Sequence, residues 1–326
     1  MLQLRKMTLP ILLGAGFITG APAEAALSIT SDGAADGFTL SLFADQFPAT
    51  GYCCGPLGIA TNSLNQVVIQ DYRDARNYVF KDVDGQHFSD ALSSAPYQSS
   101  SYGASITNSN GTLYATNNDA GAIVYKLNND GSINSPLTTT NAGGHGIWTN
   151  PATGHLVAAT ANSINDIDPS TGSFTQIVSG FNADGVSVSG DGKTIYGAGN
   201  GHVYGWNYSG ALVYDSGALG SPDGTGVIQG NNLFSGDVVA NDNSGNVWLL
   251  DPKKNTKTII ASGGSRGDYV GLDPSNGTLF LSQSDSVYRL SCGKDCGFTA
   301  PVPEPSTYLL MALGLGIVGL QKRRQA

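Results

Sequence analysis

Glutamate is almost absent from this chain. Of its 25 acidic residues only Glu24 and Glu304 are glutamates, and both lie outside the long central region between residues 26 and 300. Glutamate favours helices and aspartate favours turns, so with 44 glycines the composition predicts short strands joined by many tight turns. Any carboxylate chemistry in the central region has to rest on aspartate.

Basic residues are also scarce, with 16 Lys and Arg against 25 Asp and Glu. Five of the 16 stand in the two terminal segments, and without these five and Glu24 the chain has 11 basic and 24 acidic residues, a formal net charge of −13. Such a surface repels phosphate backbones, so nucleic acid is excluded as a partner. Cations, sugars and neutral or basic ligands remain open.

The N-terminal segment has the pattern of a secretory signal peptide. Arg5 and Lys6 precede an apolar stretch from Leu9 to Ile18, and Ala23-Glu24-Ala25 has the small-residue form of a cleavage site. We therefore expect a signal peptide over residues 1–25, with cleavage before Ala26.

The C-terminal segment combines three features: the motif at 302–305, an apolar run over 308–320, and a basic end. At about 1.5 Å per residue the 13 apolar residues form a helix of about 20 Å, which is short against the ~30 Å of bilayer hydrocarbon. The basic residues have to extend it by snorkelling. The alternative, a helix docked in a core, would leave these basic residues without acidic partners. The residues of the motif and of the basic end are Val302, Pro303, Glu304, Pro305, Lys322, Arg323 and Arg324.

This order of motif, short apolar helix and basic end resembles the PEP-CTERM sorting tail, over residues 301–326. The resemblance implies export in a Gram-negative-type bacterium, retention in the inner membrane by a transmembrane helix, and processing by an exosortase-type enzyme. The cell surface or the extracellular matrix is then the expected destination. PEP-CTERM families are associated with extracellular polysaccharide.

A repeat runs through the central region, where a glycine opens an apolar strand at spacings of 45, 43, 39, 41 and 45 residues. A period of 40 to 45 residues built from strands is typical of propeller blades. The last repeat stops after its third strand, and the strand Phe38–Ala44 is expected to complete it. We therefore predict an all-β, six-bladed propeller over residues 26–300. The six glycines are Gly58, Gly103, Gly146, Gly185, Gly226 and Gly271.

The spacing and strand order resemble six-bladed propellers of the NHL, SMP-30 and virginiamycin-lyase kind. SMP-30-like hydrolases place a metal-binding glutamate before the Gly-Pro that opens the first blade, but here Cys54 precedes Gly55-Pro56. Neither the metal nor the hydrolase activity is carried over by the resemblance. His145 is the single candidate for acid–base work, and a structural loop histidine is the alternative.

In an antiparallel blade, the loop entering the first strand lies beside the loop leaving the second, so both line one face. The ligand-face candidates in the entry loops are Tyr52, Cys53, Cys54, Tyr102, His145, Asp184, Asp223 and Asp268. The loops that leave the second strands, on the same face, contribute Asp71, Arg73, Asp74, Asn117, Asp119, Asn200, Asp242 and Asp285.

Oxygen-bearing side chains in the loops that leave the second strands suggest Ca²⁺, which takes six to eight oxygen ligands. Aspartate and asparagine are also ordinary turn formers, and this is the competing explanation. The metal-ligand candidates are Asp71, Asp74, Asn117, Asp119 and Asp242.

Four cysteines in an exported chain point to disulfides. In the closed ring Cys292 lies near the start of the Phe38 strand and Cys53 beyond its other end, about 30 Å away, too far for one bridge. We expect Cys292–Cys296 and consider a vicinal Cys53–Cys54 bridge, with free or metal-binding thiols as the alternative. No haem-attachment motif occurs.

Together these patterns favour a non-catalytic, surface-sorted propeller that binds a ligand or matrix component, with extracellular polysaccharide as the candidate. Aromatic side chains predicted to be exposed at Tyr52, Tyr72, Tyr97 and Tyr102 are suited to stacking on sugars. The alternatives are a metal-dependent hydrolase or lyase of the SMP-30 or virginiamycin-lyase kind, and a purely structural matrix protein.

Overall fold

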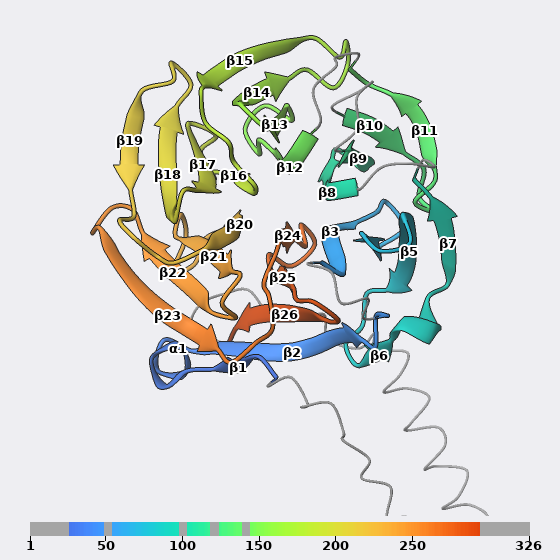
Figure 1. The fold of residues 1–326 in the computed structure, drawn as a ribbon, viewed down its shortest axis with the longest axis horizontal. Coiled ribbons are helices and arrows are strands. Elements are labelled where there is room, and N and C mark those ends of the chain that lie inside the picture. The colour runs from blue at the N-terminus through green and yellow to red at the C-terminus, as the bar shows by residue number, and fades with distance from the viewer. Residues whose placement is uncertain (1–25, 49–53, 98–102, 118–123, 139–143, 294–326) are drawn as a thin grey trace, which may run out of the picture.

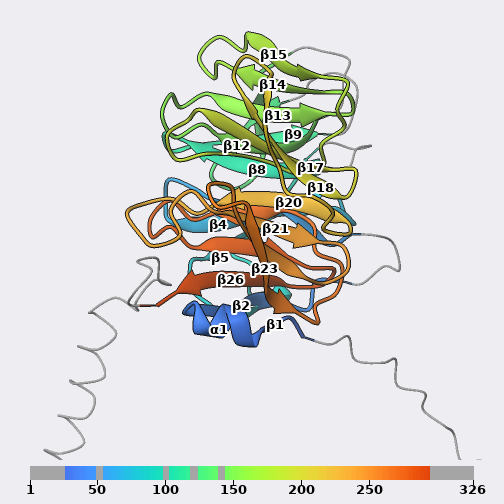
Figure 2. The ribbon, with the colours of Figure 1, turned by 90° about the vertical axis from the view of Figure 1, so that its left-hand side faces the viewer.

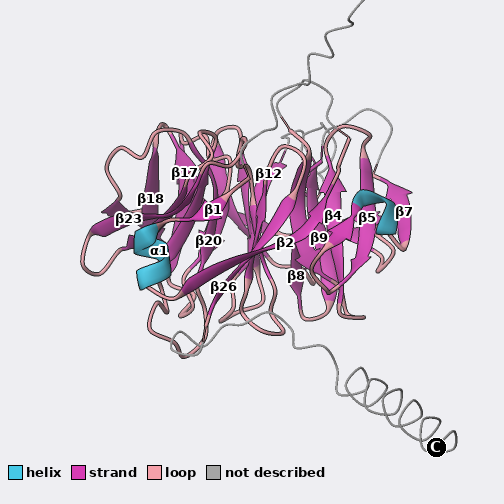
Figure 3. Ribbon diagram, turned by 90° about the horizontal axis from the view of Figure 1, so that it is seen from below, coloured by secondary structure: helices cyan, strands magenta, loops and turns pink. Residues whose placement is uncertain are grey.

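The computed structural model describes residues 26–48, 54–97, 103–117, 124–138 and 144–293. Six β-sheets stand around a common axis in chain order, as Figure 1 shows. The predicted six-bladed propeller is confirmed. In the described part of the chain, helix is limited to α1 (Ser31–Ala35) and the short 3-10 turn η1 (Phe88–Asp90), as Figure 3 shows.

Each blade has four strands, and the strand nearest the axis comes first in all six. Blade 1 is β3 (Pro56–Thr61), β4 (Gln66–Asp71), β5 (Arg76–Lys81) and β7 (Ser93–Pro96). Blade 2 is β8 (Gly103–Ser109), β9 (Thr112–Asn117), β10 (Val124–Leu127) and β11 (Ile133–Pro136). Blade 3 is β12 (Gly144–Thr149), β13 (Leu156–Thr160), β14 (Ser163–Ile167) and β15 (Phe174–Ser179).

The second half of the ring follows the same plan. Blade 4 is β16 (Val186–Val188), β17 (Thr194–Gly199), β18 (His202–Asn207) and β19 (Leu212–Asp215). Blade 5 is β20 (Pro222–Val227), β21 (Val238–Asp242), β22 (Val247–Asp251) and β23 (Thr256–Ser262), with β1 (Ser28–Ile29) added at its outer edge. Blade 6 is β24 (Val270–Leu272), β25 (Leu279–Ser282), β26 (Val287–Cys292) and β2 (Phe38–Asp45), with β6 (Gln86–His87) outside β2.

The ring closes through β2, the N-terminal strand. It pairs antiparallel with β26 in a register that places Phe38 opposite Cys292 and Leu40 opposite Leu290. The predicted closing strand is therefore confirmed. In Figures 1 and 2 β2 lies on the outside of blade 6 with α1 beside it. Because both termini of the domain meet in one sheet, blade 6 holds the ring together.

Glycines of the inner strands face the backbone of the neighbouring blade. A methyl group at Gly58 would lie 2.5 Å from the amide nitrogen of Ile106 in blade 2, and one at Gly271 would lie 2.3 Å from the carbonyl oxygen of Ile59 in blade 1. Only a residue without Cβ fits this approach. Gly58 lies inside β3 rather than at its start, at an irregularity in the pairing with β4 between Pro56 and Ile59. The repeated glycine marks the contact between blades.

The core consists of apolar layers between adjacent blades. Second strands are buried on both faces, since each stands between two neighbouring sheets, and all five residues of β13 are buried. Between blades 1 and 6 the layer includes Phe43, Val67, Phe80 and Phe280. This packing accounts for the continuous apolar runs of the second strands.

The predicted signal peptide and sorting tail lie outside the described residues. Among those that are described, no helix is long and apolar enough to cross a membrane. Cys54 and Cys292 are buried, but Cys53 and Cys296 lie outside the described ranges, so both disulfides stay predictions.

Candidate functional site

The two ends of the ring differ in chemistry. We call the end where the chain enters the inner strands the entry end, and the end where it leaves them the exit end. At the entry end the structure brings together four predicted residues: His145 in β12, Asp184 before β16, Asp223 in β20 and Asp268 before β24. With Arg266 they form what we call the entry cluster.

Backbone contacts between blades fix the spacing of these loops. The amide of Gly146 donates a hydrogen bond of 2.7 Å to the carbonyl oxygen of Asp184, and the amide of Gly185 donates one of 2.7 Å to the carbonyl oxygen of Asp223. These bonds run from blade 3 to blade 4 and from blade 4 to blade 5. The loops that carry His145, Asp184 and Asp223 are therefore joined by backbone hydrogen bonds from blade to blade.

Arg266 joins two of the carboxylates. Its Nη2 lies 2.9 Å from Oδ2 of Asp223, and its Nε lies 2.8 Å from Oδ1 of Asp268. Both aspartate side chains are buried, whereas the side chain of Arg266 is 34% exposed. The guanidinium thus faces solvent on one side and holds two buried carboxylates on the other. Sequence reasoning missed Arg266, although it stands only two residues before the predicted Asp268.

Burial raises the pKa of these carboxyl groups. Desolvation, followed by the charges of Asp268 and Asp184, raises the pKa of Asp223 well above its ordinary value. Desolvation raises the pKa of Asp268 to about 6, against the opposing charge of Arg266. The pKa of Asp184 is also raised by burial, while His145 and Arg266 act in the opposite direction. Burial therefore favours the protonated forms of these carboxyl groups relative to those of free aspartates.

His145 has a defined orientation at the edge of the cluster. Its Nδ1 lies 3.1 Å from the carbonyl oxygen of Ala183 and 3.8 Å from Oδ1 of Asp184. A carbonyl only accepts hydrogen bonds, so Nδ1 carries the proton and Nε2 of the neutral ring is left as an acceptor. The Asp184 side chain is 50% exposed. Asp184 is thus placed where a ligand can reach it, whereas the side chain of His145 beside it is 16% exposed.

The predicted metal ligands are engaged in loop structure. Oδ1 of Asp71 accepts hydrogen bonds from the backbone N and the Nε of Arg73 at 3.0 and 3.2 Å. The carboxylate of Asp242 accepts the backbone amides of Ser221 at 3.1 Å and Ser244 at 2.6 Å.

The remaining candidates are placed as follows. Asp74 accepts the hydroxyl of Tyr78, and Asn117 is buried. Tyr52, Cys53, Tyr102 and Asp119 lie outside the described ranges. Asn200 has a positive φ of 53° in the turn between β17 and β18, and the carbonyl of Asp285 accepts the amide of Phe47 at 3.0 Å.

The entry cluster does not fit a divalent cation. Arg266 already supplies the positive charge between two of its carboxylates and would repel a metal ion placed there. Within the described ranges, no group of three or more His, Cys, Asp and Glu residues is arranged to hold a metal.

One prediction about the aromatic residues is wrong. Tyr97 is buried, and its hydroxyl donates a hydrogen bond of 2.9 Å to the carbonyl oxygen of Asp71. Tyr72 is half-buried. The hydroxyl gives tyrosine a hydrogen bond inside the loop packing, so an aromatic residue in a loop sequence is not necessarily exposed.

Comparisons with known proteins give different results for the C-terminal tail and for the propeller. Residues 301–325 match the PEP-CTERM protein-sorting motif, which implies export and surface sorting in Gram-negative bacteria and recognition by an exosortase. No curated protein matches the chain in sequence.

The propeller resembles solved structures at low identity. A gluconolactonase from Xanthomonas campestris is 14% identical with a TM-score of 0.60, over 84% of this chain and 98% of that one. A virginiamycin B lyase from Staphylococcus aureus is 14% identical with a TM-score of 0.53, over 78% and 99% of the two chains. The WD40 propeller domain of Doa1 is 13% identical with a TM-score of 0.53, over 72% and 78%. At such identities the likeness establishes the propeller fold alone.

Proposed function

We propose that this surface-sorted propeller is a non-catalytic binding protein whose entry cluster recognises hydroxyl groups of an extracellular polysaccharide. The observation that carries the proposal is the ring-mounted set of polar groups at the entry end, where Arg266 bridges Asp223 and Asp268 at 2.9 and 2.8 Å. The sorting motif supports it by implying a location at the cell surface.

The entry cluster has the groups that a sugar requires. A sugar hydroxyl both donates and accepts hydrogen bonds, so its site needs acceptors and donors close together. Asp184 supplies an exposed carboxylate, His145 an acceptor nitrogen, and Arg266 a partly exposed donor. Bonds to charged groups contribute about 1.5–3 kcal/mol each. The chain's net negative charge favours a neutral or basic polymer over an acidic one.

The test is calorimetric titration of the purified protein with the producer's own extracellular polysaccharide, with and without chelator. The Asp184→Asn variant is expected to bind about tenfold more weakly, since a hydrogen bond to a charged acceptor is lost. Asp191→Asn is the matched control, because Asp191 is exposed and lies in the turn between β16 and β17 at the exit end. Equal binding by Asp184→Asn and the wild-type protein, or loss of binding in chelator, would contradict the proposal.

Hydrolase or lyase activity is the second candidate, supported by the proximity of His145 to Asp184 and by the raised pKa of Asp268, to about 6. Groups with such pKa values are suited to acid–base catalysis. In a screen of esters and lactones, turnover that disappears in His145→Gln would establish it in place of the binding role. If the protein shows neither turnover nor polysaccharide binding, a structural role in the matrix remains.

A further inference from the structure

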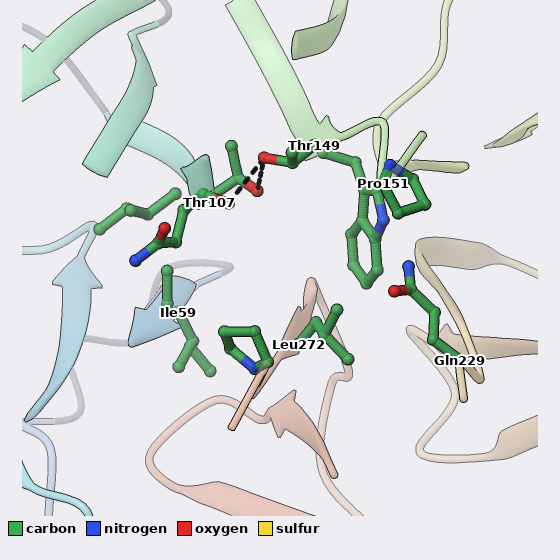
Figure 4. A pocket seen from close by; sticks show the side chains of 11 residues that line it. Ile59, Thr107, Thr149, Pro151, Gln229 and Leu272 are labelled. Carbon is green, nitrogen blue, oxygen red and sulfur yellow. Dashed lines mark hydrogen bonds between the residues drawn. The ribbon is translucent and has the colours of Figure 1, made fainter. Parts of the chain in front are cut away.

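A cavity of about 160 Å³ lies at the exit end, on the opposite side of the ring from the entry cluster. Its walls come from the ends of β3, β8, β12 and β24 and from the segment after β20. Figure 4 shows Ile59, Thr107, Thr149, Gln229 and Leu272 arranged around it. We call it the exit cavity. Sequence reasoning drew attention only to the other end.

The walls of the exit cavity are mainly apolar and carry no charge. Ile59, Ile106, Trp148 and Leu272 line it together with two prolines, and none of its eleven lining residues is ionisable. Placing a charged ligand here would cost the desolvation of the charge without an ion-pair partner. In a chain with so many aspartates, an uncharged cavity selects neutral molecules.

Most polar groups of the exit cavity already have partners. The hydroxyl of Thr149 donates to the carbonyl oxygen of Asn108 at 2.8 Å, and the hydroxyls of Thr107 and Thr149 lie 3.0 Å apart. Nδ2 of Asn108 donates to the carbonyl oxygen of Thr61 at 2.6 Å. Among the described residues, the side-chain Nε2 of Gln229 is buried and has no hydrogen-bond partner. A buried donor without an acceptor costs about 1–3 kcal/mol. A ligand acceptor in the cavity removes this cost when the side-chain amide of Gln229 rotates to bring Nε2 to the cavity surface.

The volume limits the size of the ligand. An apolar cavity of about 150 Å³ accepts one benzene-sized molecule. A sugar ring of that size carries several hydroxyl groups, and here most of them would face apolar walls without a hydrogen-bond partner. A ring with a single carbonyl oxygen matches both the walls and Gln229.

We propose that the exit cavity is a second ligand site, which takes one neutral, mainly apolar ring that carries a carbonyl acceptor for Nε2 of Gln229. The site is independent of the polysaccharide-binding role and of the entry cluster. Trp148 and Leu272 provide the apolar walls, and Gln229 positions the carbonyl.

The test is ligand-observed NMR titration of the purified full-length chain with cyclohexanone as the probe and cyclohexylammonium as its charged counterpart. We expect binding of cyclohexanone and none of the cation. Gln229→Met keeps the side-chain length but removes the donor, and should weaken cyclohexanone binding about 5- to 10-fold. Leu272→Trp should fill the cavity and abolish binding.

Controls separate this site from the entry cluster. Asp184→Asn should leave cyclohexanone binding unchanged, and thermal melting of each variant shows that it is folded. If Leu272→Trp does not fold, Gln229→Met alone decides the question. Absence of cyclohexanone binding, equal binding of the cation, or equal affinity in Gln229→Met and the wild-type protein would overturn the proposal.

Discussion

Removal of Arg289 should strongly destabilise the propeller. Its side chain is fully buried in β26 and forms ion pairs with Asp82, with Asp84 at 2.8 Å and with Asp273 at 3.0 Å. Nη1 also donates to the hydroxyl of Thr278 at 3.0 Å. Asp82 and Asp84 follow β5 of blade 1, so the guanidinium connects the first blade to the last where the ring closes.

The expected cost of Arg289→Met follows from the burial of its partners. Removing one partner of a buried ion pair typically costs about 3–5 kcal/mol, because a charge is left buried and unpaired. Asp82 and Asp84 are 10% and 26% exposed and regain water. Asp273 is fully buried but keeps hydrogen bonds from Ser275 and Asn276. We therefore expect the lower end of the range, about 3 kcal/mol.

Urea unfolding followed by circular dichroism measures this loss as a shift of the midpoint at unchanged slope. The matched control is Lys193→Met, since Lys193 is 82% exposed and lies 4.0 Å from Asp191. Surface pairs of this kind contribute little, so its midpoint should not move. A loss below about 1 kcal/mol in Arg289→Met would refute the assignment of ring closure to this cluster.

Three further predictions concern packing, pH and sorting. Gly224→Ala should cost about 3 kcal/mol in urea unfolding, because the new methyl would lie 2.3 Å from the carbonyl oxygen of Asp268. Gly190→Ala, with open space around it, should be neutral, and equal effects in the two variants would refute the role of close approach. Burial and a neighbouring carboxylate raise the pKa of Asp237 to about 7 from 3.8. Between about pH 4 and 7 the carboxyl group of Asp237 is protonated in the folded state and ionised in the unfolded state. The free energy of unfolding therefore falls as pH rises across this range. Asp237→Asn should therefore raise Tm by several degrees above pH 7 and leave it unchanged near pH 4, and a gain at pH 4 would contradict this. Replacing residues 303–305 by alanine should leave an unprocessed chain in the membrane fraction on immunoblots, whereas normal processing would show that the motif is not the recognised signal.

The fold was predictable because its signal repeats along the chain. Gly58 and Gly271 recur with the blade period since each allows the same backbone contact with the next blade. The closing strand was predictable because the last repeat lacks a strand that residues 38–44 can supply. Each of these signals is local or periodic.

The polar contacts and the cavity at the two ends of the ring were harder to predict from the sequence. Arg266 pairs with Asp223 across 43 residues, and Arg289 pairs with Asp82 across 207. No spacing rule identifies such partners, because they meet only after the ring has closed. The residues that line the exit cavity have the sequence pattern of ordinary strand ends. That Nε2 of Gln229 has no hydrogen-bond partner can be seen only in the folded structure.

Hydrogen–deuterium exchange of the full-length protein, with and without oligosaccharides from the producer's own extracellular polysaccharide, tests the central claim most directly. The proposed binding role predicts slower exchange in the entry loops, over residues 144–146, 182–185, 221–224 and 266–269, with the turns at the exit end unchanged. Protection confined to the exit end, or no protection at saturating oligosaccharide, would contradict the assignment of the entry cluster as the polysaccharide site.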